Sequence, residues 1–237
     1  MGTSIYAGDL EQRRRALADQ VATYGRRSVP VELRRDHVLT CATLAFVTDG
    51  FEGTSMQAIA AMAGVTKPVV YALFDSKEAL FAAVVDRAND ELATHVQFAI
   101  TGGTGSQLVP GVRAYLEYIA ARSALWGQLF ASLHHHVVAE AATRLRDRQM
   151  EIVVDAIGRG YEEAGLTADP RQVEALAHLV GGAVDSVGNW WIRRGTDLPI
   201  EAIVEFLVAA LAPALGAVRS EHAPIWPDST DPQEART

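Results

Sequence analysis

The sequence predicts an all-α protein, and three observations support that prediction. Alanine, leucine and glutamate dominate the periodic segments, and no long stretch alternates apolar and polar residues as a half-buried strand does. Glycine and proline interrupt these segments at intervals typical of helix ends. The 237 residues are 49% hydrophobic and 21% charged, a globular composition that excludes a wholly disordered chain.

The periodic segments predict about nine helices, preceded by a polar, arginine-rich stretch. We expect residues 1–31 to form a flexible leader. The expected helices cover about residues 34–49, 54–63, 66–74, 76–99, 108–122, 124–138, 141–164, 171–194 and 200–215. Residues 102–105 should be a flexible break, and residues 219–237, which hold three prolines, a disordered tail.

Capping residues define the short helices between residues 54 and 74. Thr54 and Gln57 have the spacing of a capping box, in which each side chain satisfies a free backbone N–H of the first turn. Gly64 ends that helix, Thr66 is the expected cap of the next, and Pro68 occupies its first turn. Two short helices joined by a glycine turn form a helix-turn-helix pattern, in which the second helix enters the DNA major groove.

The residues around this pattern carry a more specific signal. The segments are Phe51-Glu52-Gly53-Thr54-Ser55, Ala63-Gly64-Val65-Thr66-Lys67 with Tyr71 and Phe74, and Ser76-Lys77-Glu78-Ala79-Leu80. In combination they closely resemble the DNA-binding domain of TetR-family transcriptional regulators over about residues 32–92. The resemblance implies that residues 93–218 form a ligand-binding and dimerisation domain.

Nine residues of the matched segment are candidate DNA contacts. Thr54 and Tyr71 carry hydroxyls that can donate to phosphate oxygens, and Lys77 lies in the first turn of the next helix, where a cation can hold a phosphate. Lys67 can bind guanine and Val69 can touch a thymine methyl, although helix packing is the alternative for Val69 and for Ala72. The full set is Thr54, Ser55, Thr66, Lys67, Pro68, Val69, Tyr71, Ala72 and Lys77.

The arginines of the leader, Arg13–Arg15 and Arg26–Arg27, allow two interpretations. They could form an arm that reaches into a minor groove. Alternatively they belong to a solvated, mobile leader, which is the interpretation we favour.

The later helices hold aromatic residues among alanines and glycines, a pattern that leaves room for an apolar effector pocket. The candidate lining residues are Phe98, Tyr115, Trp126, Phe130, His134 and Tyr161, each with ordinary core packing as the alternative. The run His134-His135-His136 is expected inside a helix, where successive side chains point about 100° apart and cannot all reach one ion. We therefore predict no metal and no cofactor.

The last two helices are the expected homodimer interface. Ala175, Leu179, Gly182, Ala183 and Ser186 form a stripe of mostly small residues, and Val204, Leu207, Val208 and Leu211 form an apolar stripe. A twofold dimer would place two recognition helices about 34–36 Å apart, on successive turns of the major groove. The alternative is that both stripes are intrachain core.

Other classes of protein find little support. The sequence has no nucleophile elbow, P-loop, dinucleotide-binding glycine motif or zinc-protease motif, so we predict no enzyme and no catalytic residue. The single cysteine, Cys41, excludes an intrachain disulfide and reads as a small buried residue. We expect neither a membrane span nor a signal peptide, and therefore a cytoplasmic protein.

The predicted function is a DNA-binding transcriptional regulator. We expect a homodimeric repressor that a small apolar or amphipathic ligand releases from double-stranded operator DNA. The alternative is a small-molecule binding or carrier protein with a vestigial helix-turn-helix. The net charge of −8 and the apolar Val69 and Ala72 support that alternative.

Overall fold

The computed structural model describes residues 2–24, 29–101, 107–132, 134–194 and 197–217. These residues form ten helices and no strand, which confirms the all-α prediction. The helices are α1 (Gly2–Ala22), α2 (Val31–Gly53), α3 (Met56–Met62), α4 (Lys67–Leu73), α5 (Lys77–Thr101), α6 (Leu108–Ala121), α7 (Ser123–Ala131), α8 (His136–Glu163), α9 (Pro170–Arg194) and α10 (Ile200–Ala217).

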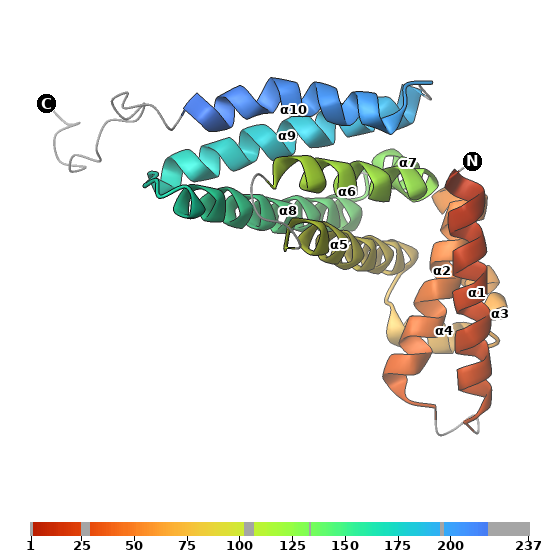
Figure 1. The fold of residues 1–237 in the computed structure, drawn as a ribbon. Coiled ribbons are helices and arrows are strands. Elements are labelled where there is room, and N and C mark those ends of the chain that lie inside the picture. Colours follow the sequence, from red (N-terminus) through yellow and green to blue (C-terminus); the bar gives the residue numbers. More distant parts are fainter. Residues whose placement is uncertain (1, 25–28, 102–106, 133, 195–196, 218–237) are drawn as a thin grey trace, which may run out of the picture.

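The helices are arranged in two groups (Figure 1). Helices α1–α4 stand at one end, with α1 alongside α2, and the long helices α5, α6, α8, α9 and α10 extend away from them in layers. Helix α5 packs on α2 at its beginning and on α6 and α8 further along. It is therefore the element that leads from one group into the other.

The N-terminal segment differs from the predicted flexible leader, because Gly2–Ala22 is the regular helix α1. Tyr6, Leu10 and Leu17 are buried, and the helix packs on α2, α6 and α7. Arg13 forms an ion pair with Asp36 of α2 at 3.1 Å. The expectation of a mobile leader is wrong for residues 2–22, since their apolar stripe is covered by the rest of the protein.

The arginines of this helix are held by carboxylates. Arg14 and Arg15 both bind Glu11 of the same helix, at 2.7 and 2.8 Å. Together with the Arg13–Asp36 pair, these contacts leave α1 joined to the body of the protein instead of forming an extended arm. Arg26 and Arg27 lie outside the described residues.

Several helix boundaries differ from the predicted ones. Helix α3 begins at Met56 instead of residue 54, and Ser55 is its N-cap, since its hydroxyl accepts a hydrogen bond from the Ala58 N–H at 3.1 Å. The helix predicted over 124–138 ends at Ala131, and α8 begins at His136. The predicted break at 102–105 and the predicted tail at 219–237 lie outside the described residues.

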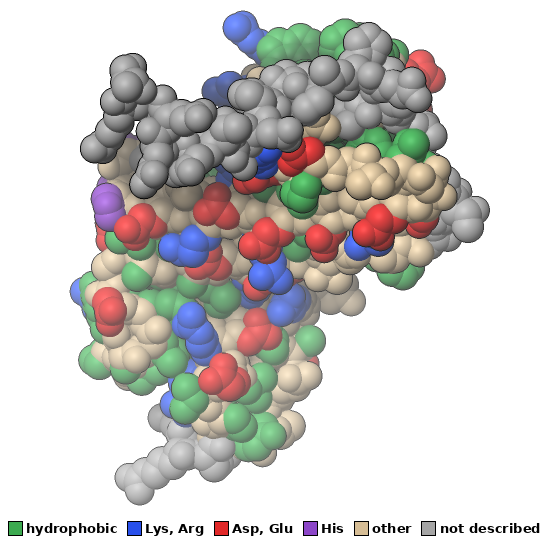
Figure 2. Space-filling model, turned by 90° about the vertical axis from the view of Figure 1, so that its left-hand side faces the viewer, with side chains coloured by type: hydrophobic (Ala, Val, Ile, Leu, Met, Phe, Trp, Pro, Cys, Tyr) green, Lys and Arg blue, Asp and Glu red, His purple; other side chains and the backbone are tan. Residues whose placement is uncertain are grey.

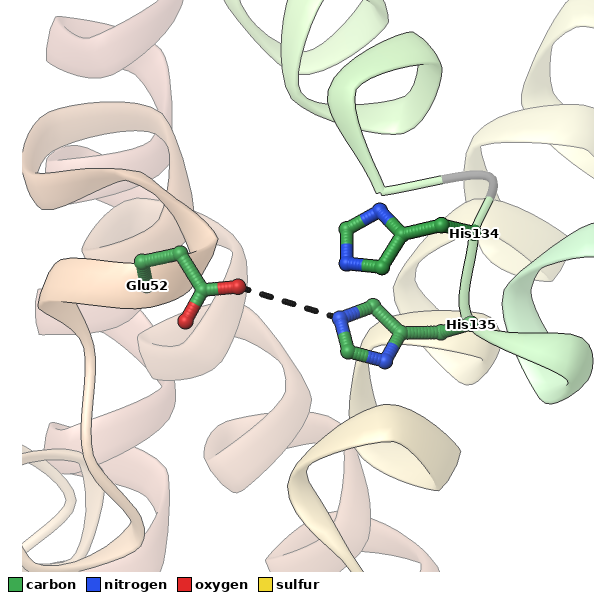
Figure 3. A group of neighbouring side chains, drawn as sticks. All are labelled: Glu52, His134 and His135. Atoms are coloured by element: carbon green, nitrogen blue, oxygen red, sulfur yellow. Dashed lines mark ion pairs between the residues drawn. The ribbon is translucent and has the colours of Figure 1, made fainter.

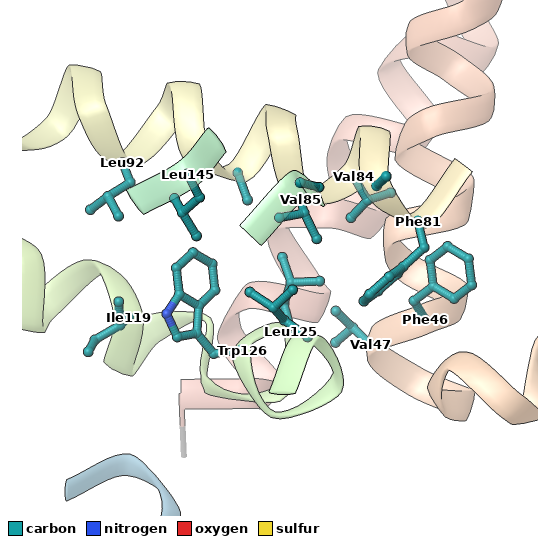
Figure 4. Close-up of a cluster of buried hydrophobic side chains, with 14 of the residues drawn as sticks. Phe46, Val47, Phe81, Val84, Val85, Leu92, Ile119, Leu125, Trp126 and Leu145 are labelled. Atoms are coloured by element: carbon teal, nitrogen blue, oxygen red, sulfur yellow. The ribbon is translucent and has the colours of Figure 1, made fainter. Parts of the chain in front are cut away.

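The hydrophobic core is continuous between the two groups of helices. Phe46 of α2 meets Phe81 of α5 edge-on, with ring centroids 4.9 Å apart, and Leu125 of α7 lies close to them (Figure 4). The same cluster continues to Ile119 of α6 and Leu145 of α8. Because one apolar cluster contains buried residues of both groups, the N-terminal helices pack directly onto the long helices.

The two stripes predicted to form the dimer interface differ in exposure. The residues Val204, Leu207 and Leu211 of α10 are buried within the chain, so assigning this stripe to a dimer interface is wrong. The stripe of α9 faces outward, with Leu179 50% exposed and Gly182 exposed as well. The apolar stripe of α10 is buried because it packs on α6 and α9.

One face of the molecule carries both signs of charge. Figure 2 shows acidic and basic side chains interspersed on one face of the molecule. Ion pairs also join α5 and α8, with Arg144 3.1 Å from Asp86 and Arg148 3.6 Å from Asp90. Among the described residues, no single helix is long and apolar enough to cross a membrane; only α3 and α4 taken together pass that test, as a pair bent by 104°.

Candidate DNA-binding and effector sites

Helices α3 and α4 form a helix-turn-helix. Their axes differ in direction by 104°, within the range of about 90–120° that is usual for this motif. Gly64 makes the turn with a φ of +64°, a conformation that favours glycine. Ile59 of α3 and Val70 of α4 are fully buried, so their packing fixes how the second helix is presented.

The outer face of α4 carries most of the predicted DNA contacts. Thr66, Lys67, Pro68, Tyr71 and Ala72 are exposed. Val69 is half-buried, and Ser55 is exposed at the start of α3 while it caps that helix. The Lys67 ammonium lies 5.7 Å from the centroid of the Tyr71 ring, so these two side chains share one patch of surface.

The side chains of Thr54 and Lys77 make hydrogen bonds within the protein. Thr54 is buried, and its hydroxyl donates to the Gly50 carbonyl at 2.7 Å, which contradicts the outward hydroxyl expected for a phosphate contact. The Lys77 ammonium donates to the Phe51 carbonyl at 3.0 Å and lies 4.3 Å from the centroid of the Phe51 ring. Both side chains therefore hold the end of α2 in place in this structure.

The end of α2 forms a joint between the two groups of helices, made by Gly50, Phe51 and Glu52. Gly50 has φ +77° and ψ 168°, which kinks the helix. The Phe51 N–H donates to the side-chain carbonyl of Gln128 in α7 at 3.1 Å. The turn between α7 and α8 approaches from the same side, where the His135 ring lies 4.9 Å from the Phe51 ring.

A cavity of about 670 Å³ lies among α5, α6, α8, α9 and α10. Its wall is mostly apolar, with Gln107, Gln149 and Glu163 among the few polar side chains. The apolar lining includes Leu92, Val96, Ile100, Val112, Met150, Val153, Ala156, Ile157, Val180, Val184 and Leu215. Its size lies within the range of about 300–1,000 Å³ typical of small-molecule sites.

A smaller cavity of about 250 Å³ shares part of this wall, because Tyr115 and Gln149 line both. Its lining also includes the charged side chains of Arg146 and Asp185. The Tyr115 hydroxyl donates to Asp185 at 2.6 Å. Burial, followed by the nearby carboxylate of Asp185, raises the pKa of Tyr115 well above its usual value, so the phenol remains a neutral hydrogen-bond donor.

The residues predicted to line the effector pocket do not all line the same cavity. Tyr115 and Tyr161 line the large cavity, and the Tyr161 hydroxyl donates to the Leu215 carbonyl at 2.7 Å. Trp126 lines only the smaller cavity. Phe98 is 82% exposed, so its assignment to the pocket is wrong.

Two predicted pocket residues remain. His134 is exposed in the turn before α8, beside His135 and Glu52 and away from both cavities, so its assignment is also wrong. The side chain of Phe130 lies outside the described part of the structure. The predictions missed the aliphatic side chains of α5, α8 and α9, whose helical spacing is the same whether they line a cavity or fill a core.

A helix-turn-helix with an exposed second helix, carried on an all-helical body, defines a protein of the DNA-binding regulator class. Residues 39–84 match the family model described as "Bacterial regulatory proteins, tetR family". The chain is 30% identical over 181 residues to the HTH-type transcriptional activator FasR of Mycolicibacterium smegmatis, which covers 75% of this chain and 80% of that protein.

Solved structures have the same fold. A TetR-family regulator from Mesorhizobium loti superposes with a TM-score of 0.63 at 24% identity, covering 81% of this chain and 98% of that one. The regulator FadR of Bacillus subtilis, in complex with stearoyl-CoA, gives 0.61 at 14% identity, covering 75% and 97%. The chain belongs to the TetR family and is a DNA-binding transcriptional regulator, not an enzyme.

The joint gives a first prediction. Replacing Gly50 by alanine should lower the free energy of unfolding by about 1–3 kcal/mol, because alanine is strained at this backbone conformation. The new Cβ would also lie 3.3 Å from the Gln128 side-chain oxygen. Urea denaturation of both proteins measures the change.

The matched control for this prediction is Gly53→Ala. Gly53 ends the same helix without a positive φ, and its new Cβ would make only an ordinary contact, 3.6 Å from the Asp49 Cβ. We expect this variant to be as stable as the parent. Equal stability of the Gly50 variant and the parent would contradict the strain argument.

Proposed function

We propose that this regulator binds operator DNA through α4 and that an apolar, chain-like ligand in the large cavity controls the binding. The observation that carries the proposal is the cavity of about 670 Å³ with its aliphatic wall, which is lined in part by α5, the helix that follows the helix-turn-helix in the chain. Because the proposed partner is operator DNA, we expect the protein to act in the cytoplasm.

The exposed face of α4 supports a specific division of roles. Lys67 would donate to a guanine edge, and Tyr71 and Thr66 would donate to phosphate oxygens. Val69 and Ala72 would meet thymine methyl groups, while Pro68 and Ser55 would help fix the starts of the two helices against the DNA backbone. In this proposal Thr54 and Lys77 position the motif through their contacts with the end of α2.

Replacing Lys67 or Tyr71 by alanine should weaken binding to the DNA upstream of the protein's own gene by about tenfold or more. Fluorescence anisotropy at a fixed salt concentration measures the affinity. Arg159→Ala is the control, because Arg159 is exposed on α8, far along the chain from the motif. Parent-like affinity of both α4 variants would contradict the assigned interface.

The chemistry of the cavity favours a long acyl chain as the ligand. Aliphatic side chains from α5, α8 and α9 can bury methylene groups, each contributing about 0.8 kcal/mol. Tyr115 and Gln149, which line both cavities, and Arg146 of the smaller cavity can hold a polar end. The FadR structures point to the same chemistry: the Bacillus subtilis protein is in complex with stearoyl-CoA, and the Bacillus halodurans protein is named a fatty acid degradation regulator.

We propose that the ligand releases the protein from its operator. A chain inserted between α5 and α8 would displace α5, whose first turn holds the joint, and the two recognition helices of a dimer would lose the groove spacing. A coupling free energy of about 1–3 kcal/mol between ligand binding and DNA binding changes the operator affinity 5- to 150-fold. FasR is named an activator, so a bound regulator of this kind can also raise transcription, and ligand release would then lower it.

Ala156 lines the cavity and allows a test of the ligand site. Ala156→Phe should weaken stearoyl-CoA binding at least about tenfold, because the ring occupies the space of the chain. Its operator affinity without ligand should match the parent's. In the parent, added stearoyl-CoA should weaken operator binding; calorimetry and anisotropy measure the two quantities.

Ala121→Phe is the control for this variant, because Ala121 is exposed at the end of α6 and lies outside both cavities. Unchanged stearoyl-CoA binding by the Ala156 variant would exclude this cavity as its site. Tighter operator binding with the ligand would overturn the proposed direction.

We further propose a homodimer formed by the outer faces of α9 and α10. Leu179, Gly182 and Ser186 of α9 are exposed, as is Trp190 further along the same face. Phe206 of α10 is 61% exposed on the neighbouring helix. Large apolar side chains beside small residues on adjacent helices are typical of a helix-bundle interface.

Phe206→Glu should convert the dimer into monomers, because the interface would then bury an unpaired charge. Light scattering coupled to size exclusion measures the mass, and operator affinity should fall with it. Glu205→Gln, at the adjacent exposed position, should remain dimeric. A Phe206 variant with the mass of the parent would contradict this interface.

A further inference from the structure

We propose that Glu52, His134 and His135 form a binding site for a divalent transition metal of the zinc class, which bridges the end of α2 and the turn between α7 and α8. One ligand atom from each residue lies within 4.8 Å of the other two. Two imidazole nitrogens and one carboxylate oxygen are ligands that zinc prefers, with a fourth position left for water. This inference goes beyond the effector proposed above.

The turn between the helices brings the two histidines together. Helix α7 ends at Ala131, and His135 has an extended backbone, with φ −82° and ψ 122°, before α8 begins. The two imidazole rings are consequently 4.0 Å apart, centroid to centroid. In a continuous helix the same side chains would point about 100° apart and could not share an ion.

Both imidazoles aim a nitrogen at Glu52 (Figure 3). The Nε2 atom of His135 lies 3.8 Å from Oε1 of Glu52; it is buried and has no hydrogen-bond partner. A buried polar atom without a partner costs free energy, and coordination of a cation would satisfy it. Two ligands of a tetrahedral zinc ion lie about 3.3 Å apart, so modest movement closes the site.

His134 has the second contact expected of a metal ligand. Its Nδ1 lies 3.1 Å from the Ala131 carbonyl. A proton on Nδ1 donated to that carbonyl leaves the lone pair on Nε2, which faces Glu52 (Figure 3). Backbone carbonyls that orient metal-bound histidines in this manner fix both the tautomer and the direction of the ring.

The site would fasten the joint between the two groups of helices. Glu52 belongs to the kinked end of α2, next to Phe51, whereas the two histidines belong to the turn that also contacts the Phe51 ring. A bound ion would thus cross-link the carrier of the helix-turn-helix to the effector body. Cys41, the single thiol, is buried, and burial raises its pKa to about 11, so it does not compete for the metal.

Isothermal titration of the full chain, freed of any affinity tag and of metal, with Zn²⁺ alone tests the proposal. We expect one ion per chain in the parent. Glu52→Gln, His134→Asn and His135→Asn should each weaken binding by at least about tenfold. Glu52 and His134 are exposed, so two of these variants should keep the fold, which circular dichroism verifies.

His136→Asn is the matched control. The side chain of His136 is 85% exposed and faces Glu140 on α8, 3.6 Å away, instead of Glu52. This variant should bind Zn²⁺ like the parent. Absence of binding by the parent, or equal binding by all four variants, would overturn the proposed site.

Hydrogen exchange tests the cross-link independently of DNA and effector. Zn²⁺ should slow amide exchange at residues 50–53 and 134–137 of the parent, and should leave the Glu52→Gln variant unchanged. Binding of one Zn²⁺ ion without slower exchange at residues 50–53 would overturn the bridge between the two groups of helices.

Discussion

The backbone at Gly50 is the constraint on which the arrangement of the two groups of helices depends. Its positive φ ends the regular part of α2 and turns Phe51 toward the long helices. Three elements then meet at Phe51: Lys77 of α5 caps its carbonyl, Gln128 of α7 accepts its N–H, and His135 packs on its ring. A side chain at Gly50 would strain this arrangement, so a single residue links backbone geometry to the orientation of the helix-turn-helix.

Helix α5 connects this joint with the large cavity. Its 25 residues span about 37 Å at the usual rise, and its first residue, Lys77, holds the joint. Leu92, Val96 and Ile100, near its other end, line the cavity. An α-helix can shift as a rigid element without unfolding. A ligand that displaces α5 at Val96 would therefore also displace the Lys77 contact at its first turn.

The N-terminal domain was largely predictable because its motif depends on local residue chemistry. The Gly64 turn, the start of α4 and the outward face with Lys67 and Tyr71 follow from capping rules and helical spacing. Helix α1 was missed because the run of arginines suggested a solvated segment. Tyr6, Leu10 and Leu17 are spaced four and seven residues apart, so a helical stripe was present in the sequence.

The remaining errors share one physical origin, which is that a helix boundary decides the direction of a side chain. The sequence predicts His134 and His135 inside a helix, and the end of α7 at Ala131, seven residues before the predicted end, reverses the conclusion about whether they can meet. Phe98 shows the same limit, since amphipathic spacing identifies a helix but not which neighbour covers each face. Residues that act across elements, such as Glu52 with His135, depend on tertiary packing, and a single sequence carries no local signal for it.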